Sequence, residues 1–327
     1  MTFYKDKNVL VTGSTGMIGS HLVEALIKKR ANVRAIAHLR STEYLPKSRK
    51  IEIIKSDLTK FEDCKKAVKG MDYIFQLAAV VGGVSFNVTH RGTLFSKNIL
   101  IQTNMLEASK QEGVKRYLFT SSACVYPSVC KVPISEEECV VGVFDRPPER
   151  TNNAYGWVKR MGELQAQYYK EEYEMKIAIV RPFNVFGPRD NFDLETSHVI
   201  PSLIRKAVER QKPFKIWGTG EPSRDFVFVT DTARGMMLAL EKYAVADPVN
   251  LASGRDIKIK DLAALILKIS GYENPQIVFE KSKPLGQLVR RGSTKKAKKV
   301  LGFKTKVSLK EGLRITIDWY RNKFNVN

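Results

Sequence analysis

The stretch VLVTGSTGMIG, residues 9–19, decides the fold class of this 327-residue chain. Its apolar start predicts a buried strand, and residues 16–30, with apolar side chains at helical spacing and basic ones at the end, predict a helix. Between them lie Gly13, Gly16 and Gly19, which allow a sharp turn and let backbone N–H groups approach a pyrophosphate at the helix N-terminus. This context predicts dinucleotide binding in preference to a glycine turn that serves packing alone.

The alternation of apolar runs and helical patterns continues along the chain. It predicts further strands at residues 32–38, 51–57, 72–79, 114–122 and 176–182, and helices at 61–70, 93–113 and 154–173. Strands linked in this way imply right-handed crossovers, so we expect an α/β fold with a Rossmann-like, doubly wound parallel sheet. We assign residues 1–182 to this dinucleotide-binding domain. Residues 183–327 are expected to form mainly a smaller C-terminal substrate-binding lobe, with segments at about 224–245 returning to the first domain.

The net charge of the chain is +21, from 55 basic and 34 acidic residues. The densest basic run, residues 290–299, is typical of a solvated lysine-rich helix face, and no nucleic-acid-binding motif accompanies it, so we expect no nucleic-acid partner. No apolar run approaches the roughly 18 residues of a membrane span, and the N-terminus has no apolar signal core, so we expect a cytoplasmic protein without a membrane partner. The four cysteines lack metal-binding spacing, which predicts free thiols and no metal.

The end of the second predicted strand distinguishes the two nicotinamide dinucleotides. An acidic residue there would bind the adenosine ribose hydroxyls and favour NAD. The sequence instead has Ala37, followed by His38 and Arg40, which leaves room for a 2′-phosphate. We therefore predict NADP, with NAD as the alternative. Asp57, after the third strand, is a candidate for binding the adenine amino group and, equally, for capping a turn.

Tyr155 and Lys159, in the stretch YGWVK, lie four residues apart and share one face of a predicted helix. A lysine ammonium beside a phenol favours the phenolate, so we expect Lys159 to lower the pKa of Tyr155. The tyrosine can then exchange a proton with a sugar oxygen while hydride moves at the attached carbon. Ser122 precedes this pair in the stretch TSSACVYP, residues 120–127.

Together these motifs resemble the extended short-chain dehydrogenase/reductase family, which includes NAD-dependent epimerases and dehydratases. The resemblance covers essentially the whole chain and rests on TGSTGMIG, LAA, TSSACVYP, YGWVK, RPFNVFGP and WGTGEPSRDF. It implies an enzyme that acts on a nucleotide sugar, with Ser122, Tyr155 and Lys159 at the reacting oxygen. It also places Arg224 at the sugar-nucleotide diphosphate, because an arginine fork suits a phosphate. The alternative is a salt bridge from Arg224 to Asp225 or to another nearby acid.

The family resemblance and the glycine loop together predict one set of cofactor-binding residues and one set of substrate-binding residues. The residues expected to bind the cofactor are Gly13, Thr15, Gly16, Met17, Ile18, Gly19, His38, Arg40, Asp57, Leu58, Leu77, Ala78, Ala79, Asn98, Tyr155, Lys159 and Pro182. The residues expected to bind the substrate are Val81, Gly82, Ser122, Asn184, Arg205, Trp217, Arg224 and Arg290.

Two stretches narrow the resemblance within the family. GPRDNFDLETSHVIPSLIRKA, residues 187–207, and AAVVGG, residues 78–83, are very similar to the corresponding segments of GDP-L-fucose synthases. Such enzymes epimerise a GDP-4-keto-6-deoxyhexose at C3 and C5 and reduce C4 with NADPH. The ketone acidifies the protons on C3 and C5, and the resemblance assigns the proton transfers there to Cys124 and His198. We therefore expect an NADPH-dependent 3,5-epimerase/4-reductase.

Other features leave alternatives open. SSAC, residues 121–124, and LKEGLRITIDWY, residues 309–320, resemble GDP-mannose 3,5-epimerases. They favour a redox-neutral, NAD-dependent NDP-sugar epimerase of that type or of the hexose 4-epimerase type. A remote alternative is a non-catalytic dinucleotide-binding regulator, against which the intact Tyr–Lys pair argues. Members of the family often pair through two helices, so we expect a homodimer formed by residues 93–113 and the helix of the Tyr–Lys pair.

Overall fold

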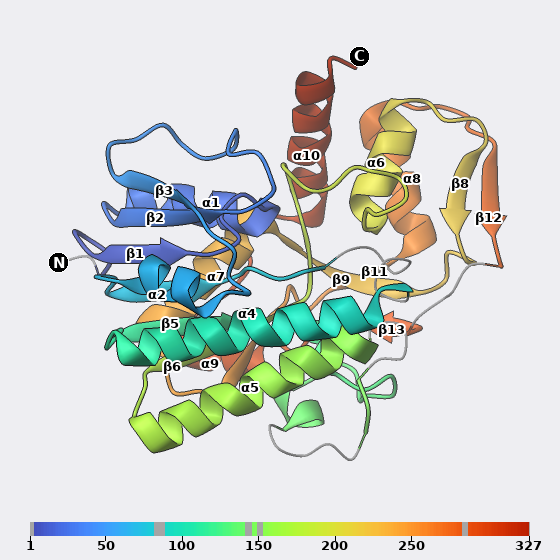
Figure 1. Cartoon of the computed structure of the whole chain (residues 1–327). Coiled ribbons are helices and arrows are strands. Elements are labelled where there is room, and N and C mark those ends of the chain that lie inside the picture. Colours follow the sequence, from blue (N-terminus) through green and yellow to red (C-terminus); the bar gives the residue numbers. More distant parts are fainter. Residues whose placement is uncertain (1–2, 82–88, 141–145, 149–152, 283–286, 327) are drawn as a thin grey trace.

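A computed structural model of the chain describes residues 3–81, 89–140, 146–148, 153–282 and 287–326 (Figure 1). Its centre is a seven-stranded sheet in which every pair of neighbouring strands is parallel. In spatial order the strands are β10 (Pro248–Leu251), β6 (Ile177–Pro182), β5 (Arg116–Thr120), β4 (Tyr73–Gln76), β1 (Asn8–Val11), β2 (Asn32–Ala37) and β3 (Ile51–Lys55). The predicted doubly wound α/β fold is confirmed.

Helices cover both faces of this sheet because its central strands carry apolar side chains on both sides. Val9 and Val11 of β1 contribute to one core, while Leu10 between them contributes to the other. The first core is covered by α1 (Met17–Lys28), α7 (Val229–Lys242) and α9 (Lys295–Leu301). The second is covered by α2 (Phe61–Val68), α4 (Arg91–Gln111) and α5 (Asn153–Tyr173), and α4 and α5 lie side by side on the outside (Figure 1).

The strand order reverses between β1 and β4, which are neighbours although β2 and β3 come between them in the chain. Ligands of doubly wound sheets bind in the crevice outside the carboxyl ends of the strands at such a reversal. The glycine loop after β1 and residues 77–81 after β4 both leave the sheet at this edge. The fold therefore puts the predicted phosphate loop where a dinucleotide is expected.

The smaller lobe is built around β9 (Ser223–Phe228). This strand pairs with β7 (Asn184–Phe186), β11 (Asp256–Lys258) and β13 (Val289–Arg290), while β8 (Phe214–Trp217) pairs with β12 (Ile277–Glu280). The helices α6 (Val199–Val208), α8 (Ile259–Ser270) and α10 (Leu309–Phe324) bury a core rich in phenylalanine, isoleucine and leucine. After β9 the chain returns to the large sheet, since α7 packs on α1 and β10 pairs with β6.

Two short 3-10 turns follow β5: η1 (Ala123–Val125) and η2 (Glu136–Cys139). All four cysteines are free, with Cys64 and Cys139 buried and Cys124 and Cys130 half-buried. Within the described ranges, no three His, Cys, Asp or Glu side chains gather in a way that would hold a metal ion. Nor does that part of the chain contain a helix long and apolar enough to cross a membrane.

Candidate active site

The glycine loop is packed tightly against the segment after β4. Gly13 has a φ of +62°, and a Cβ there would lie 3.0 Å from the Ala78 nitrogen. The Thr12 hydroxyl oxygen accepts hydrogen bonds from the backbone N–H groups of Leu77 (3.0 Å) and Ala78 (2.9 Å). Among the described residues, no side chain caps the N-terminus of α1 at Gly16, so its first N–H groups are available to bind an anion.

Asn98 holds the other wall of this crevice. From α4, its Oδ1 accepts a hydrogen bond from the Val80 N–H (2.9 Å), and its Nδ2 donates to the Val80 carbonyl (2.8 Å) and the Leu94 carbonyl (2.8 Å). The amide therefore fixes the backbone beside Leu77, Ala78 and Ala79, and a direct contact between Asn98 and the cofactor stays a prediction. Val81 is 45% exposed at the end of this wall, and the predicted substrate residue Gly82 lies outside the described residues.

The predicted adenosine end of the site opens between β2 and the second lobe. His38 and Arg40 are exposed directly after β2. A cavity of about 330 Å³ is lined by Thr15, Arg40, Ser41, Glu43, Tyr44, Arg189, Asp190 and Asn191. Met17 and Ile18 begin α1 close to Thr15 of this lining. The glycine loop, the basic end of β2 and the stretch 189–191 thus meet at one cavity.

Asp57 is engaged in a turn in this structure. Its carboxylate accepts hydrogen bonds from the Thr59 N–H (3.1 Å) and hydroxyl (2.7 Å), and these two bonds lower the pKa of Asp57. This is the capping role that we considered beside adenine binding. Leu58 next to it is buried in the core under α2.

Ser122, Cys124, Tyr155 and Lys159 gather where β5 ends and α5 begins. The Ser122 hydroxyl oxygen accepts a hydrogen bond from the Cys124 N–H (3.1 Å), which shapes η1. Gly156, next to Tyr155, faces this turn so closely that a Cβ there would lie 2.5 Å from the Cys124 carbonyl oxygen. Lys159 is 5% exposed, and its Nζ lies 5.4 Å from the centroid of the Tyr155 ring.

The electrostatics of the Tyr–Lys pair differ from our expectation. Burial raises the pKa of Tyr155, and the nearby Cys124 adds to the rise, whereas we predicted that Lys159 would lower it. The reason is the direction of the ammonium group: Lys159 Nζ donates to the Thr120 carbonyl (2.8 Å) and lies over the ring face of Tyr155. Burial also lowers the pKa of Lys159 to about 8, against the opposing effects of Glu163 and Cys124.

His198 occupies the N-cap position of α6 and is exposed. Its charge acts on Asp190, a residue that our reading of the sequence missed. Burial raises the pKa of Asp190 to about 6, with His198, the N–H of Asn191 and Arg40 opposing the rise. Asp190 Oδ2 is buried and has no hydrogen-bond partner among the described residues. The structure thus brings His198 near Asp190, while no contact between the described atoms joins His198 to Cys124.

Arg224 and Arg290 lie opposite each other on the neighbouring strands β9 and β13. Arg290 Nη2 donates to the Ala123 carbonyl (2.7 Å), inside the turn that carries Cys124. Arg224 Nη1 donates to the carbonyls of Gln287 (2.7 Å) and Ser223 (2.8 Å). The alternative salt bridge between Arg224 and Asp225 is absent from the contacts of the described residues, because the Asp225 carboxylate accepts its hydrogen bonds from Ser253, Gly254 and Gly292.

The remaining predicted residues lie at the end of the large sheet and in the smaller lobe. Pro182 ends β6, and Asn184 Nδ2 donates to the Asp225 carbonyl (2.9 Å). Arg205 on α6 pairs with Glu209 (3.1 Å), and Trp217 at the end of β8 is 45% exposed. Direct contacts of these residues with substrate stay predictions.

With this geometry, residues 9–252 match the model of the NAD dependent epimerase/dehydratase family. The chain belongs to this family. Membership makes it an enzyme with a nicotinamide dinucleotide cofactor, in agreement with the glycine loop and the Tyr–Lys pair.

Relatives extend over nearly the whole chain. The GDP-L-fucose synthase of Sinorhizobium fredii is 33% identical over 313 residues, which cover 94% of this chain and 93% of that protein. The structure of UDP-glucose 4-epimerase from Thermotoga maritima with UDP-glucose superposes with a TM-score of 0.88 at 29% identity, covering 97% of this chain and 99% of that one. A GDP-L-fucose synthetase from Naegleria fowleri bound to NADP gives a TM-score of 0.84 at 26% identity, with 99% and 96% covered.

Proposed function

We propose that this family member is an NADPH-dependent 3,5-epimerase/4-reductase of a GDP-4-keto-6-deoxyhexose. The observation that carries the proposal is the position of Cys124. It shares a turn with Ser122, and it lies close enough to Tyr155 and Lys159 to raise the pKa of both. A thiol beside a phenol suits two reactions at one sugar. The thiol can exchange a proton on the carbon next to a ketone, and the phenol can deliver a proton to the ketone oxygen. The likeness to GDP-L-fucose synthase along the whole chain supports the GDP sugar.

In this proposal each side chain has one task. Cys124 removes a proton from the carbon next to the C4 ketone, and His198 delivers one to the opposite face of the sugar. Ser122 donates a hydrogen bond to the C4 oxygen, and Tyr155 gives that oxygen a proton. When bound, the nicotinamide dinucleotide supplies the hydride for C4. Lys159 contributes positive charge under the Tyr155 ring, and Arg224 and Arg290 are candidates for the diphosphate of the substrate.

We propose NADP rather than NAD because two arginines, Arg40 and Arg189, line the cavity beside the glycine loop, together with the carboxyl groups of Glu43 and Asp190. Arg40 and Arg189 line it together with Thr15, and Arg189 Nη1 is buried without a hydrogen-bond partner among the described residues. Guanidinium groups bind a phosphate monoester through charge-assisted hydrogen bonds. The relative from Naegleria fowleri, which is bound to NADP, supports this choice.

The cofactor preference can be tested with Arg40→Ser. We expect the affinity for NADPH to fall about 10- to 100-fold, as for the loss of a hydrogen bond to a charged group, while the affinity for NADH stays the same. The measurement is a fluorescence titration of each reduced dinucleotide. Arg49→Ser is the matched control, because Arg49 is an exposed arginine of the same connection after β2. Equal losses for NADPH and NADH would contradict the assignment of Arg40 to the 2′-phosphate.

The proposed reaction is tested by incubating the purified protein with GDP-4-keto-6-deoxymannose and NADPH in deuterated water. We expect NADPH oxidation, followed by absorbance, and deuterium at C3 and C5 of the product, followed by mass spectrometry. A protein that oxidises neither NADPH nor NADH with this substrate is not the proposed reductase.

The second candidate is a redox-neutral NDP-sugar epimerase. The sequence SSAC at residues 121–124 and the structural similarity to UDP-glucose 4-epimerase favour this candidate. Such an enzyme would epimerise GDP-mannose or UDP-glucose with bound NAD and no net consumption of cofactor. The same assay separates the candidates, because only the reductase consumes NADPH in proportion to product.

We also propose a homodimer formed through α4 and α5. These helices lie side by side on the outer face of the sheet (Figure 1) and expose Phe95, Leu100 and Tyr168 to between 40% and 55%. Exposed apolar side chains on adjoining helices can contribute to a protein interface. We expect light scattering to give twice the chain mass of 37.0 kDa and Leu100→Glu to halve it. A monomeric wild-type protein would contradict this interface.

A further inference from the structure

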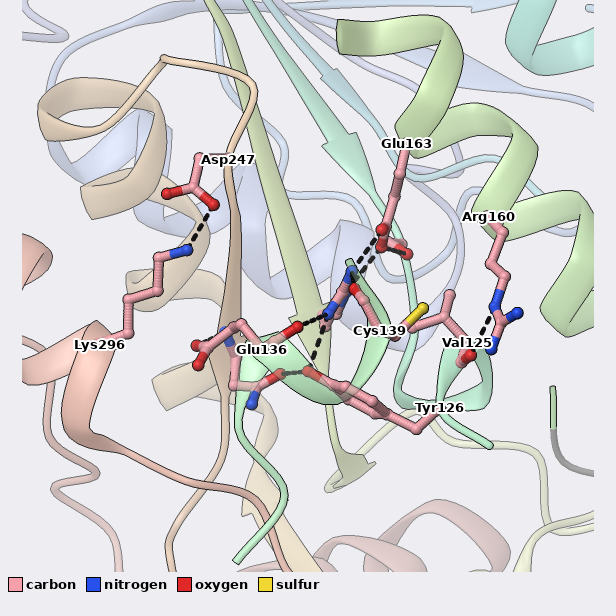
Figure 2. Close-up of polar contacts among 11 residues, drawn as sticks. Val125, Tyr126, Glu136, Cys139, Arg160, Glu163, Asp247 and Lys296 are labelled. Carbon is pink, nitrogen blue, oxygen red and sulfur yellow. Dashed lines mark hydrogen bonds and ion pairs between the residues drawn. The ribbon is translucent and has the colours of Figure 1, made fainter. Parts of the chain in front are cut away.

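A fully buried ion pair joins β6 to α5 next to the turn that carries Ser122 and Cys124, and Figure 2 shows its Glu163 carboxylate. Arg181 of β6 and Glu163 of α5 are 0% and 1% exposed, and they form a two-pronged contact, from Nε to Oε1 (2.8 Å) and from Nη2 to Oε2 (2.6 Å). Glu163 lies one helical turn after Lys159. Removing two charges from water is costly, so such a pair is weak evidence for stability by itself. Its remaining contacts point to another role.

These contacts reach both ends of residues 121–126, which we call the 121–126 segment. At its start, the Ser121 hydroxyl donates to Glu163 Oε1. At its end, the Tyr126 hydroxyl accepts from Arg181 Nη1 (3.0 Å) and donates to Asn250 Oδ1 (2.6 Å) (Figure 2). A single ion pair therefore fixes the two residues that bracket Ser122, Ala123, Cys124 and Val125.

Further cations hold the backbone around and between these ends. Arg290 Nη2 donates to the Ala123 carbonyl (2.7 Å), Arg160 Nε donates to the Val125 carbonyl (2.8 Å; Figure 2), and Lys159 Nζ donates to the Thr120 carbonyl (2.8 Å). The 121–126 segment is thus held mainly by charged donors from α5, β6 and β13. Charge-assisted hydrogen bonds are directional and strong, so they define the path of the backbone more sharply than apolar packing does.

We propose that Glu163 and Arg181 are positioning residues, which hold the 121–126 segment so that Ser122 and Cys124 stay aligned with Tyr155. This inference rests on the proposed function for its kinetic test. It accounts for the convergence of a buried ion pair and three further cations on residues 120–126. It also accounts for the place of Glu163 on the same helix as Tyr155 and Lys159, since one rigid element then sets both sides of the site.

The position of Glu163 has a consequence for Lys159. The described titratable groups that act on Lys159 are Glu163 and Cys124, both of which raise its pKa against the effect of burial. The ammonium lies over the rings of Phe119 and Tyr155. Lys159 then loses its proton at about pH 8, so kcat/KM of the wild-type protein should fall above that pH. Removing the negative charge of Glu163 lowers the pKa of Lys159 further, and this descending limb should move to lower pH.

Three variants test the proposal. Ser121→Ala removes one contact of the segment, Glu163→Gln removes the charge, and Glu163→Gln with Arg181→Met removes the whole pair without leaving a lone buried cation. Asp231→Asn is the control, because Asp231 is also a buried carboxylate paired with an arginine, but it contacts Arg234 and the backbone of residues 306–307 instead of the 121–126 segment.

We expect kcat to fall about tenfold in Ser121→Ala and about 100-fold in Glu163→Gln, with KM unchanged. The alkaline fall in kcat/KM should move to lower pH in Glu163→Gln and keep its wild-type position in Asp231→Asn. The double variant should regain thermal stability relative to Glu163→Gln, because no buried charge is left unpaired, while its kcat stays low. A double variant that regains both stability and wild-type kcat would reduce the pair to a structural role and overturn the proposal.

A second readout does not depend on turnover. The rate at which iodoacetamide alkylates Cys124, measured by peptide mass spectrometry, reports on how the segment presents the thiol. We expect this rate to change in Ser121→Ala and Glu163→Gln and to equal the wild-type rate in Asp231→Asn. The same rate in all four proteins would overturn the proposal. If the wild-type protein converts no nucleotide sugar but the alkylation rates change as expected, the proposed function fails and the positioning role stands.

Discussion

Cys124→Ala is expected to stop deuterium incorporation at C3 and C5 of the GDP-4-keto-6-deoxyhexose and to lower turnover about 1000-fold. The size is that of a lost general acid–base group. Cys124 is the thiol beside the Tyr–Lys pair, and its turn is fixed by the hydrogen bond between its N–H and Ser122 (3.1 Å). Alanine keeps that N–H, so the turn should survive while the proton-transferring group is lost. The measurement is mass spectrometry of the sugar after incubation in deuterated water with NADPH.

Two comparison variants make this result specific. Tyr155→Phe keeps the ring over which Lys159 lies but removes the hydroxyl, so we expect exchange at C3 and C5 to continue while NADPH oxidation falls. Cys130→Ala removes a second half-buried thiol, one that donates to the Pro127 carbonyl (3.1 Å), and should leave both reactions intact. Exchange at wild-type rate in Cys124→Ala would show that another group removes the protons.

Local patterns were sufficient to predict six of the seven strands of the large sheet and the Tyr–Lys pair, but not the edge strand β10. The strands around the glycine loop are short apolar runs whose alternation survives in the structure, since Val9 and Leu10 face different cores. Tyr155 and Lys159 are four residues apart on one helix, so their proximity needs no tertiary contact. The four-residue spacing did not predict the direction of the pKa shift of Tyr155 correctly. That shift depends on the burial of Tyr155 and on where the Lys159 ammonium points.

Local sequence patterns could not predict residues whose roles depend on contacts with residues distant in the sequence. Arg181 lies in an apolar strand and acquires its role only when β6 brings it to Glu163 and Tyr126. Asp190 lies in a polar loop that resembles any exposed connection, and only the packing of that loop buries its carboxyl near His198. The single available signal was a charged residue inside a predicted buried strand, which calls for a buried partner.

The glycine loop gives the second large expected effect, in Gly19→Ala. A Cβ on Gly19 would lie 2.2 Å from the Gly13 carbonyl oxygen and 2.8 Å from the Ser14 Cα. Both are backbone atoms, so no side-chain rotation relieves the clash. Either α1 or the loop must move, and the N–H groups at the start of α1 then leave their place opposite the pyrophosphate. We expect NADPH affinity to fall about 100-fold and the free energy of unfolding to fall by about 1–3 kcal/mol.

The glycine loop cannot move away from the added methyl group without breaking its own contacts, so we expect this single methyl group to have a large effect. Gly13 is itself held at a φ of +62° with Ala78 3.0 Å from where its Cβ would be, and Thr12 anchors the N–H groups of Leu77 and Ala78. Gly92→Ala is the control, because a Cβ there meets no atom of the described residues within 4 Å. Fluorescence titration with NADPH and denaturant unfolding should show wild-type affinity and equal or higher stability for Gly92→Ala. Wild-type NADPH affinity in Gly19→Ala would mean that the dinucleotide does not depend on the close approach of α1 to the loop.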